Sequence, residues 1–147
     1  PVKIQFLLEM EELQKCNELS VKFGLTLTEA QIQNLMERRF EALKSTGRIE
    51  FGEGILKKLI YAFCDSPYIL QEDYENTLIE LQDSFYYFKN ESKDLISDDE
   101  LIEFMKELFD GRAKGSLDYL TGASLTDLCR NTSYDYRIGD KYPYEHE

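Results

Sequence analysis

Apolar residues recur at intervals of three and four along most of the chain, the spacing that lays an apolar face along an α-helix. The clearest stripe belongs to a helix predicted over about residues 72–90, and its members are Tyr74, Leu78, Leu81, Phe85 and Phe88. This stripe covers two heptads, fewer than a coiled coil needs. We therefore interpret it as one wall of a globular core.

Capping residues mark the ends of further helices. Thr28 and Gln31 have the spacing of a capping box, and the apolar stripe after them consists of Ile32, Met36, Phe40 and Leu43. Ser97 and Glu100 repeat that box before a helix that ends near Gly111. The remaining predicted helices cover about residues 8–23, 55–64, 116–121 and 124–130.

Two segments alternate polar and apolar side chains, as half-buried strands do. They run from Val2 to Phe6 and from Arg48 to Phe51. The second segment is interpreted as a short extended piece before a turn, and it could pair with the first as a short two-stranded ribbon. An isolated pair of strands is only marginally stable in water, which weighs against the ribbon.

Together these patterns predict an all-α fold, with one compact domain of five to seven helices over residues 1–130. No repeat of solenoid length and no low-complexity linker divides the chain. Residues 131–147 form a tyrosine-rich C-terminal arm that contains Tyr134, Tyr136, Tyr142 and Tyr144. We predict that this arm packs on the helices, and the alternative is a tail that binds a partner.

Composition narrows the class of protein. A chain of 147 residues, 42% of them hydrophobic, can hold a core without disulfides or a structural metal. Seventeen basic and 29 acidic residues give a net charge of −12. Such a charge argues against partners that present phosphate, so we expect neither nucleic acid nor an anionic membrane to bind. Three widely spaced cysteines and no apolar stretch of membrane-spanning length predict a cytoplasmic protein.

Familiar catalytic signatures are missing from the sequence. The single histidine, His146, is the penultimate residue, a poor place for a rigid catalytic imidazole. Phosphate-binding glycine loops and nucleophile elbows are also absent. Cys64 is predicted to end a helix beside Asp65, where neither a helix N-terminus nor a basic neighbour would lower its pKa, so we expect a buried, inert thiol. No cofactor and no catalytic residue is predicted.

The segment 89–110 is strongly acidic, with eight acidic and three basic residues. Its first twelve residues superficially resemble a calcium-binding EF-hand loop, but lysines stand at two ligand positions and Asp94 stands where the turn needs glycine. Calcium binding is therefore not predicted. The carboxylates of Asp98, Asp99 and Glu103 are expected either to complement a helix N-terminus or to form a surface for a basic partner.

Nine phenylalanines and ten tyrosines are more aromatic residues than one core stripe needs. Tyr86 and Tyr87 stand between two stripe residues, so they must lie on the flanks of the helix. Another helix, the C-terminal arm or a second subunit should cover them. Since tyrosine buries a ring while its hydroxyl stays wet, Tyr86, Tyr87 and the four arm tyrosines are candidate interaction residues.

Several short motifs resemble a small, uncharacterised bacterial family, a helical domain of unknown function. They are GRIEFG at 47–52, FCDS at 63–66, FYY at 85–87 with KNE at 89–91, DELI at 99–102 and GSL at 115–117. The resemblance covers most of the chain. It implies a bacterial cytoplasmic domain, and it carries no activity, cofactor or site residue over to this sequence.

Three hypotheses for the function remain. The first is a non-enzymatic acidic helical module that acts through protein contacts, with an unknown protein or a second copy as its partner. The second is a regulatory domain that binds a divalent metal or a small molecule through carboxylates from Asp98 to Glu103. The third is an enzyme that uses only carboxylates and tyrosines, which a deep pocket lined by Glu50, Asp65 or Tyr87 would support.

Overall fold

The structure is a computed structural model of the chain, and it describes residues 2–50 and 54–130. Every regular element within these ranges is helical. The first half contains α1 (Val2–Lys15), α2 (Asn17–Ser20), the 3-10 turn η1 (Val21–Phe23), α3 (Glu29–Thr46) and α4 (Leu56–Phe63). The second half contains the turn η2 (Gln71–Asp73), α5 (Tyr74–Glu91), α6 (Asp98–Asp110), α7 (Leu117–Gly122) and α8 (Leu125–Arg130).

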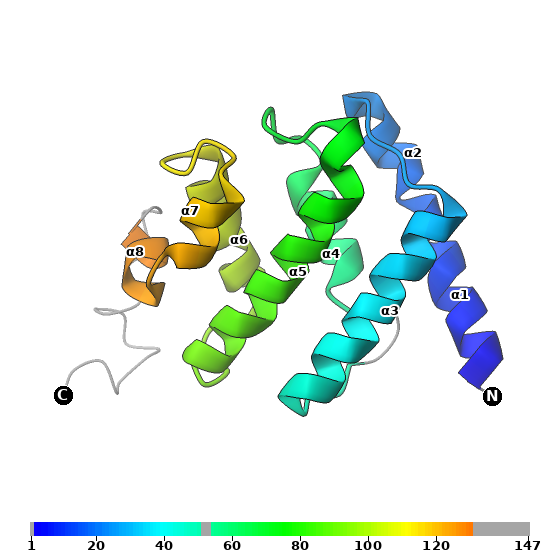
Figure 1. Cartoon of the computed structure of the whole chain (residues 1–147), viewed down its shortest axis with the longest axis horizontal. Coiled ribbons are helices and arrows are strands. Elements are labelled where there is room, and N and C mark those ends of the chain that lie inside the picture. Colours follow the sequence, from blue (N-terminus) through cyan, green and yellow to red (C-terminus); the bar gives the residue numbers. More distant parts are fainter. Residues whose placement is uncertain (1, 51–53, 131–147) are drawn as a thin grey trace.

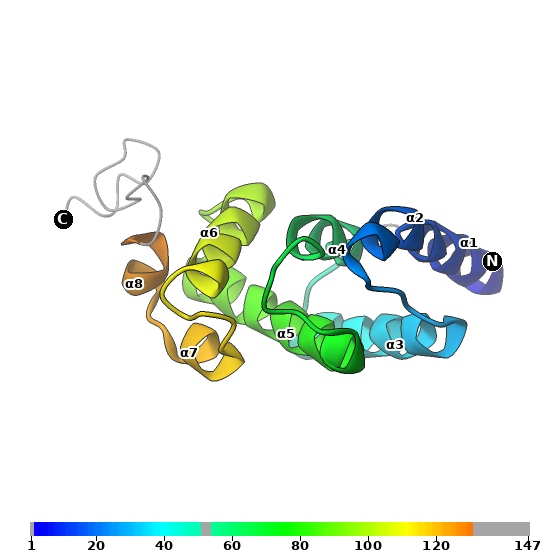
Figure 2. The ribbon, with the colours of Figure 1, turned by 90° about the horizontal axis from the view of Figure 1, so that it is seen from above.

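The helices form two layers, which are seen edge-on in Figure 2. The front layer holds α3, α5 and α7, with α5 in the middle (Figure 1). The back layer holds α1, α2, α4 and α6, and α8 packs on α6 at one end. Since α5 contacts α3, α7, α4 and α6, it is the central helix of the fold.

The predicted stripe of α5 is the centre of the core. All five of its apolar residues are buried, from Tyr74 to Phe88. One face of α6 is buried as well, with Leu101, Phe104, Met105 and Leu108 inside, and the ring of Phe63 on α4 packs edge to face against Phe109 of α6, with 5.6 Å between the ring centres. These contacts confirm the prediction of a single helical domain.

The capping box predicted at Thr28 and Gln31 is confirmed, and of the box predicted at Ser97 and Glu100 the structure shows the cap by the Ser97 side chain. The Thr28 side chain accepts a hydrogen bond from the Gln31 backbone N–H, and the Gln31 side chain accepts one from the Thr28 N–H. Ser97 accepts the Glu100 N–H at the start of α6, and Ser116 accepts the Tyr119 N–H at the start of α7. Each cap satisfies a backbone N–H that its own helix leaves unpaired.

The two-stranded ribbon is not present. Val2 to Phe6 is the first part of α1, and no residue in the described part of the chain is a strand. Phe6 packs against the core one turn before Met10 and Leu13, so helical spacing extends back through this segment. Gln5 also donates to Glu9 four residues later, a helical contact. Of the other candidate strand, Phe51 lies outside the described residues.

Two further details of the predicted helices are wrong. The first predicted helix breaks at Cys16 into α1, α2 and η1, and Phe23 at its end is half-exposed. Phe40, assigned to the core stripe of α3, is 45% exposed, whereas Arg39 beside it is only 1% exposed. An apolar pattern predicts the aromatic ring inside, but here two acidic side chains allow the arginine to take that place.

Candidate functional site

The two central tyrosines of α5 have different surroundings. Successive helical residues are separated by about 100° around the axis, so Tyr86 and Tyr87 face different neighbours. Tyr86 is 2% exposed, and Tyr87 is 54% exposed on the outer side of the front layer. The structure thus confirms that both lie on the flanks of the core stripe. The C-terminal arm, predicted to cover them, lies outside the described residues, as do Tyr134, Tyr136, Tyr142 and Tyr144.

Tyr86 belongs to a buried polar network centred on Arg39 of α3. The Arg39 Nη1 group lies 3.3 Å from Glu9 Oε1 on α1, and its Nε group donates to Glu50 Oε1 at 3.1 Å. The same Glu50 oxygen accepts the Tyr86 hydroxyl at 2.8 Å. Four segments far apart in the sequence therefore meet at one guanidinium. This network holds the Tyr86 hydroxyl inside the protein.

Burial makes ionisation of the Tyr86 phenol unfavourable. It raises the pKa of Tyr86 far above its ordinary value, and the neighbouring Glu50 carboxylate raises it further. Tyr86 is therefore a neutral hydrogen-bond donor and is not suited to act as a base. Gly54 completes the network by its lack of a side chain: a Cβ atom there would meet the Glu50 carboxylate and lie 2.6 Å from Arg39 Nε.

An open hollow of about 520 Å³ lies between the C-terminal halves of α3 and α5. Its lining residues are Arg38, Glu41, Ala42, Ser45, Thr46, Asp83, Tyr86, Tyr87 and Asn90. Arg38 Nη2 lies 3.6 Å from Asp83 Oδ2 across the hollow. Partial burial raises the pKa of Asp83, an effect that Arg38 opposes and Glu41 reinforces.

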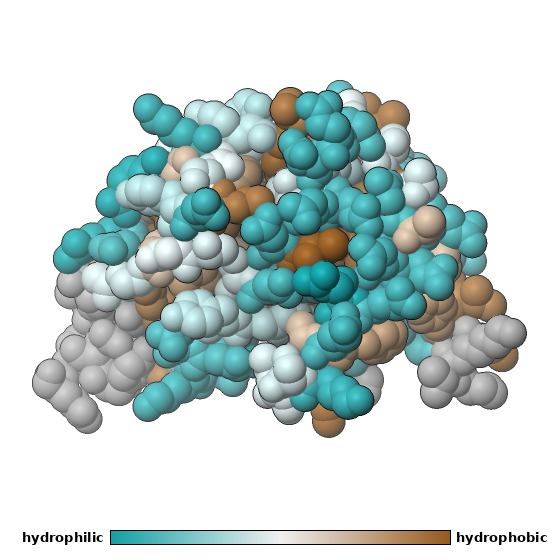
Figure 3. Space-filling model, viewed as in Figure 1, coloured by the Kyte–Doolittle hydropathy of each residue, from teal (hydrophilic) through white to brown (hydrophobic). Residues whose placement is uncertain are grey.

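A second hollow, of about 250 Å³, lies on the other flank of α5, toward α7. Asp83, Ser84, Tyr87 and Thr121 line it. Because Asp83 and Tyr87 line both hollows, they form a ridge between the two. We call the surface formed by Arg38, Glu41, Asp83, Ser84, Tyr87 and Thr121 the α5 face. Figure 3 shows the molecule from the side of α3, α5 and α7. The surface on this side is mostly hydrophilic and has isolated apolar patches.

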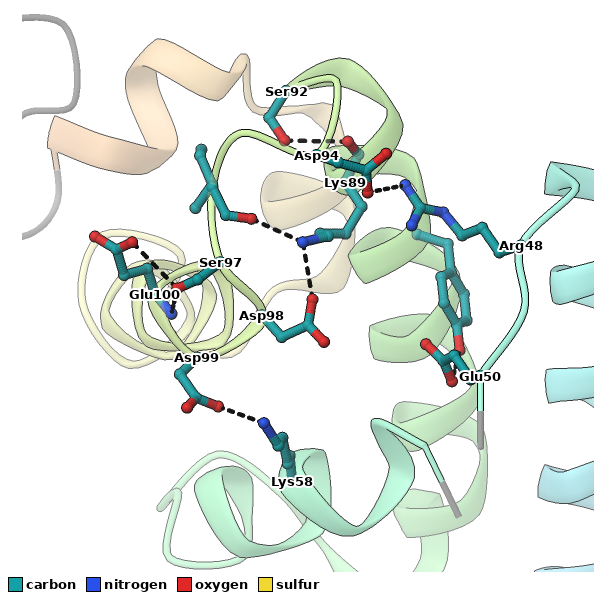
Figure 4. A network of polar contacts seen from close by, with 12 residues as sticks. Arg48, Glu50, Lys58, Lys89, Ser92, Asp94, Ser97, Asp98, Asp99 and Glu100 are labelled. Carbon is teal, nitrogen blue, oxygen red and sulfur yellow. Dashed lines mark hydrogen bonds and ion pairs between the residues drawn. The ribbon is translucent and has the colours of Figure 1, made fainter. Parts of the chain in front are cut away.

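The acidic residues of α6 lie elsewhere. Asp98 pairs with Lys89 at 2.8 Å, and Asp99 pairs with Lys58 at 2.8 Å (Figure 4). Glu103 is exposed on α6. The hydrogen bond to Asp99 raises the pKa of Lys58. Asp99 and Tyr61 line a hollow of about 330 Å³ between α4 and α6. The predicted interaction residues are therefore divided between two surfaces.

The ammonium group of Lys89 lies inside the turn over residues 89–100, the segment that superficially resembles a calcium-binding loop. The Lys89 Nζ group donates to the Ile96 carbonyl at 2.8 Å as well as to Asp98 (Figure 4). Arg48 reaches the same turn, donating to Asn90 and pairing with Asp94 at 2.6 Å. Within residues 2–50 and 54–130, no cluster of three histidine, cysteine or acidic side chains could hold a metal ion.

Glu50, Asp65 and Tyr87, the residues named for a carboxylate or tyrosine enzyme, have different surroundings. Glu50 belongs to the Arg39 network, Asp65 pairs with Lys106 at 2.6 Å, and Tyr87 lines open hollows. Cys64 is buried, as predicted, and burial with the nearby Asp65 raises the pKa of its thiol.

Three residues of this region were not identified from the sequence. Arg39 shares the helical spacing of the core residues Ile32, Met36 and Leu43, but its charge argued against a buried position. Ser84 and Thr121 are isolated hydroxyls 37 positions apart. Their roles depend on which helices lie side by side. A spacing analysis of α5 alone finds Tyr87 and Asp83 on one face, because they are four residues apart.

Comparison with known proteins assigns the chain to a family but to no known function. None of the helices in the described ranges has the length and apolar character needed to cross a membrane. No curated protein and no solved structure matches the sequence. The model of a family of unknown function, DUF6323, matches residues 12–138, which is most of the chain. The protein therefore belongs to the DUF6323 family, whose function is not known.

Proposed function

We propose that this protein is a non-enzymatic acidic helical module that acts through protein contacts, and that the α5 face is its contact surface. The observation that carries this proposal is the position of Tyr87. Its half-exposed ring stands on a helix between two hollows. Tyrosine in such a position can bury a ring against a partner while its hydroxyl stays hydrated.

The α5 face is a better candidate for the contact surface than the hollow between α4 and α6. In the latter, Asp99 is already paired with Lys58 at 2.8 Å. On the α5 face, the pair between Asp83 and Arg38 is longer, at 3.6 Å, and both side chains are about half-exposed. Such a pair contributes little to folding, so a partner can replace it at small cost.

Charge favours a different protein over a second copy of this chain. Two copies would each bring a net charge of −12, and their long-range interaction would be repulsive. A partner with a basic segment would be attracted instead. We also propose a cytoplasmic location, since its three cysteines are buried and form no disulfide in the described structure, as in a reducing compartment.

Affinity capture from the native host tests the proposal. Tagged wild-type protein should recover one protein in stoichiometric amount, and Tyr87→Ala should lose it. Tyr61→Ala is the matched control, because Tyr61 is a similarly exposed tyrosine beside the other hollow. Unfolding curves should show that both variants are as stable as the wild type. Equal recovery by the Tyr87→Ala variant, or loss only in Tyr61→Ala, would reject the α5 face.

A further inference from the structure

The smaller hollow beside α5 contains an unusual group, the hydroxyl of Ser84. The residue is 4% exposed, and its Oγ atom has no hydrogen-bond partner in the described part of the chain. Most buried polar groups in folded proteins are paired, because an unpaired one costs free energy. A buried hydroxyl without a partner at the wall of a hollow is a group whose hydrogen-bonding capacity a bound molecule or a water would satisfy.

The other groups around the hollow are acceptors of hydrogen bonds and a π surface. Asp83 supplies a carboxylate whose Oδ2 atom lies 3.6 Å from Arg38 Nη2. Thr121 donates its hydroxyl proton to the Asp118 carbonyl at 3.3 Å, which leaves its Oγ1 atom free to accept. Tyr87 supplies a half-exposed aromatic ring. Among the residues that the structure describes, no lysine, arginine or histidine lines this hollow.

We propose that the hollow between α5 and α7 receives an arginine side chain from the partner protein. A guanidinium presents five N–H donors in a flat fork, and it can stack on an aromatic ring while it binds a carboxylate. In this arrangement its N–H groups donate to the Asp83 carboxylate and to the hydroxyl oxygens of Ser84 and Thr121. Its flat surface lies against Tyr87.

Size and setting favour a side chain over a whole small molecule. Pockets that enclose small-molecule ligands have volumes of about 300–1,000 Å³ and surround most of the ligand. This hollow measures about 250 Å³ and is open to solvent. The larger hollow, on the far side of the Asp83 and Tyr87 ridge, offers space for residues that flank the arginine. The inference rests on the proposed contact function, since it names the group that the contact surface recognises.

Nuclear magnetic resonance titration of the full chain tests this inference. The probe is a pentapeptide with one central arginine among alanines and with both ends blocked, and the control peptide carries citrulline, the neutral isostere, in its place. We expect the arginine peptide to shift the amide signals of Asp83, Ser84, Tyr87 and Thr121. The citrulline peptide should bind roughly tenfold more weakly or worse, since hydrogen bonds to a charged group are the strong ones.

Three variants make the test specific. Asp83→Asn should lower the affinity for the arginine peptide roughly tenfold. Asp99→Asn removes an acidic group from the hollow between α4 and α6 and should leave this affinity unchanged. Ser84→Ala should also weaken binding, yet keep or raise the stability of the free protein, because it removes an unpaired hydroxyl. A serine with a merely structural role would show the opposite pattern.

Several results would overturn the inference. The first is a citrulline peptide that binds as tightly as the arginine peptide. The second is amide signals that shift over the whole acidic surface, and the third is an affinity that Asp83→Asn does not change. Tighter binding of free arginine than of the blocked peptide would also overturn it, by assigning the hollow to a metabolite. If the peptide fails but Tyr87→Ala still loses the captured partner, the contact function stands and only the arginine is rejected. If the peptide binds but no partner depends on Tyr87, the contact function fails instead.

Discussion

The Nε group of Arg39 donates to Oε1 of Glu50 at 3.1 Å, and it does so inside the protein, where Arg39 is 1% exposed. This contact joins α3 to the segment that leads to α4, and the Glu50 oxygen also accepts the Tyr86 hydroxyl. The hollow between α3 and α5 thus has a fixed wall, because Tyr86 cannot turn without breaking the network. We expect the same contact to contribute strongly to the free energy of unfolding of the domain.

Removing the guanidinium should destabilise the fold strongly. Arg39→Met leaves the carboxylates of Glu9 and Glu50 buried without their cation, and breaking such a pair costs about 3–5 kcal/mol of the free energy of unfolding. Arg38→Met, which removes an exposed arginine from the neighbouring position, should cost less than about 1 kcal/mol. Urea unfolding of both variants measures the difference. Equal losses would show that the Arg39 network is not structural.

The same network predicts different effects of alanine at two glycines. Gly47 and Gly54 both have positive φ angles, of 68° and 56°. Gly47→Ala should lower the free energy of unfolding by about 1–2 kcal/mol, the strain of an alanine in the left-handed conformation. No further loss is expected, because none of the described atoms lies within 4 Å of the new methyl group. Gly54→Ala should lose about 1–3 kcal/mol more, since its methyl group would collide with Glu50 and Arg39. Thermal unfolding that ranks the two variants in the reverse order would contradict the geometry.

The stability of the protein should fall at alkaline pH partly through Tyr86. Its pKa is raised on folding, so the unfolded chain loses this proton first, at about pH 10. Above that pH the unfolded state binds fewer protons than the folded state, and unfolding becomes easier by about 1.4 kcal/mol per pH unit for this one group. Urea unfolding from pH 8 to 11 should therefore show a shallower decline for Tyr86→Phe than for the wild type. Parallel curves would mean that the phenol ionises equally well in both states.

A core amide offers a stabilising substitution. Gln82 on α5 is fully buried, and neither atom of its amide group has a hydrogen-bond partner in the described structure. Gln82→Met keeps the length of the side chain and removes the unpaired groups, so it should raise the free energy of unfolding by about 1–3 kcal/mol. Gln33→Met, on the exposed side of α3, serves as control and should change it by less than about 0.5 kcal/mol. A clear loss of stability in Gln82→Met would show that the amide has a partner, such as a buried water.

The parts of the fold that follow local chemistry were predictable from sequence. The box of Thr28 and Gln31 and the cap at Ser97 require residues only three positions apart, and both are present as predicted. The α5 stripe is also local, because one helix determines which residues share a face. The start of α1 was predicted as a possible strand, because Ile4 and Phe6 alone fit the two-residue period of a strand.

The contacts of the site depend on tertiary structure and were not predictable. Arg39 is buried only because Glu9 and Glu50, 30 and 11 residues away, meet it in space. Tyr86 was correctly placed on a flank, but nothing in the sequence identifies Glu50 as its partner. The hollow beside α5 combines Ser84 with Thr121, and their proximity follows from the packing of α7 on α5.

The central claim is that the α5 face is where the protein meets its partner, and photo-crosslinking in the native host tests it most directly. A photoreactive phenylalanine analogue at position 87 should join the protein covalently to one other protein, at a segment that contains arginine. The same analogue at position 61, beside the hollow between α4 and α6, should give no such product. A crosslink from position 61 but not from position 87, or crosslinks from neither, would contradict the claim.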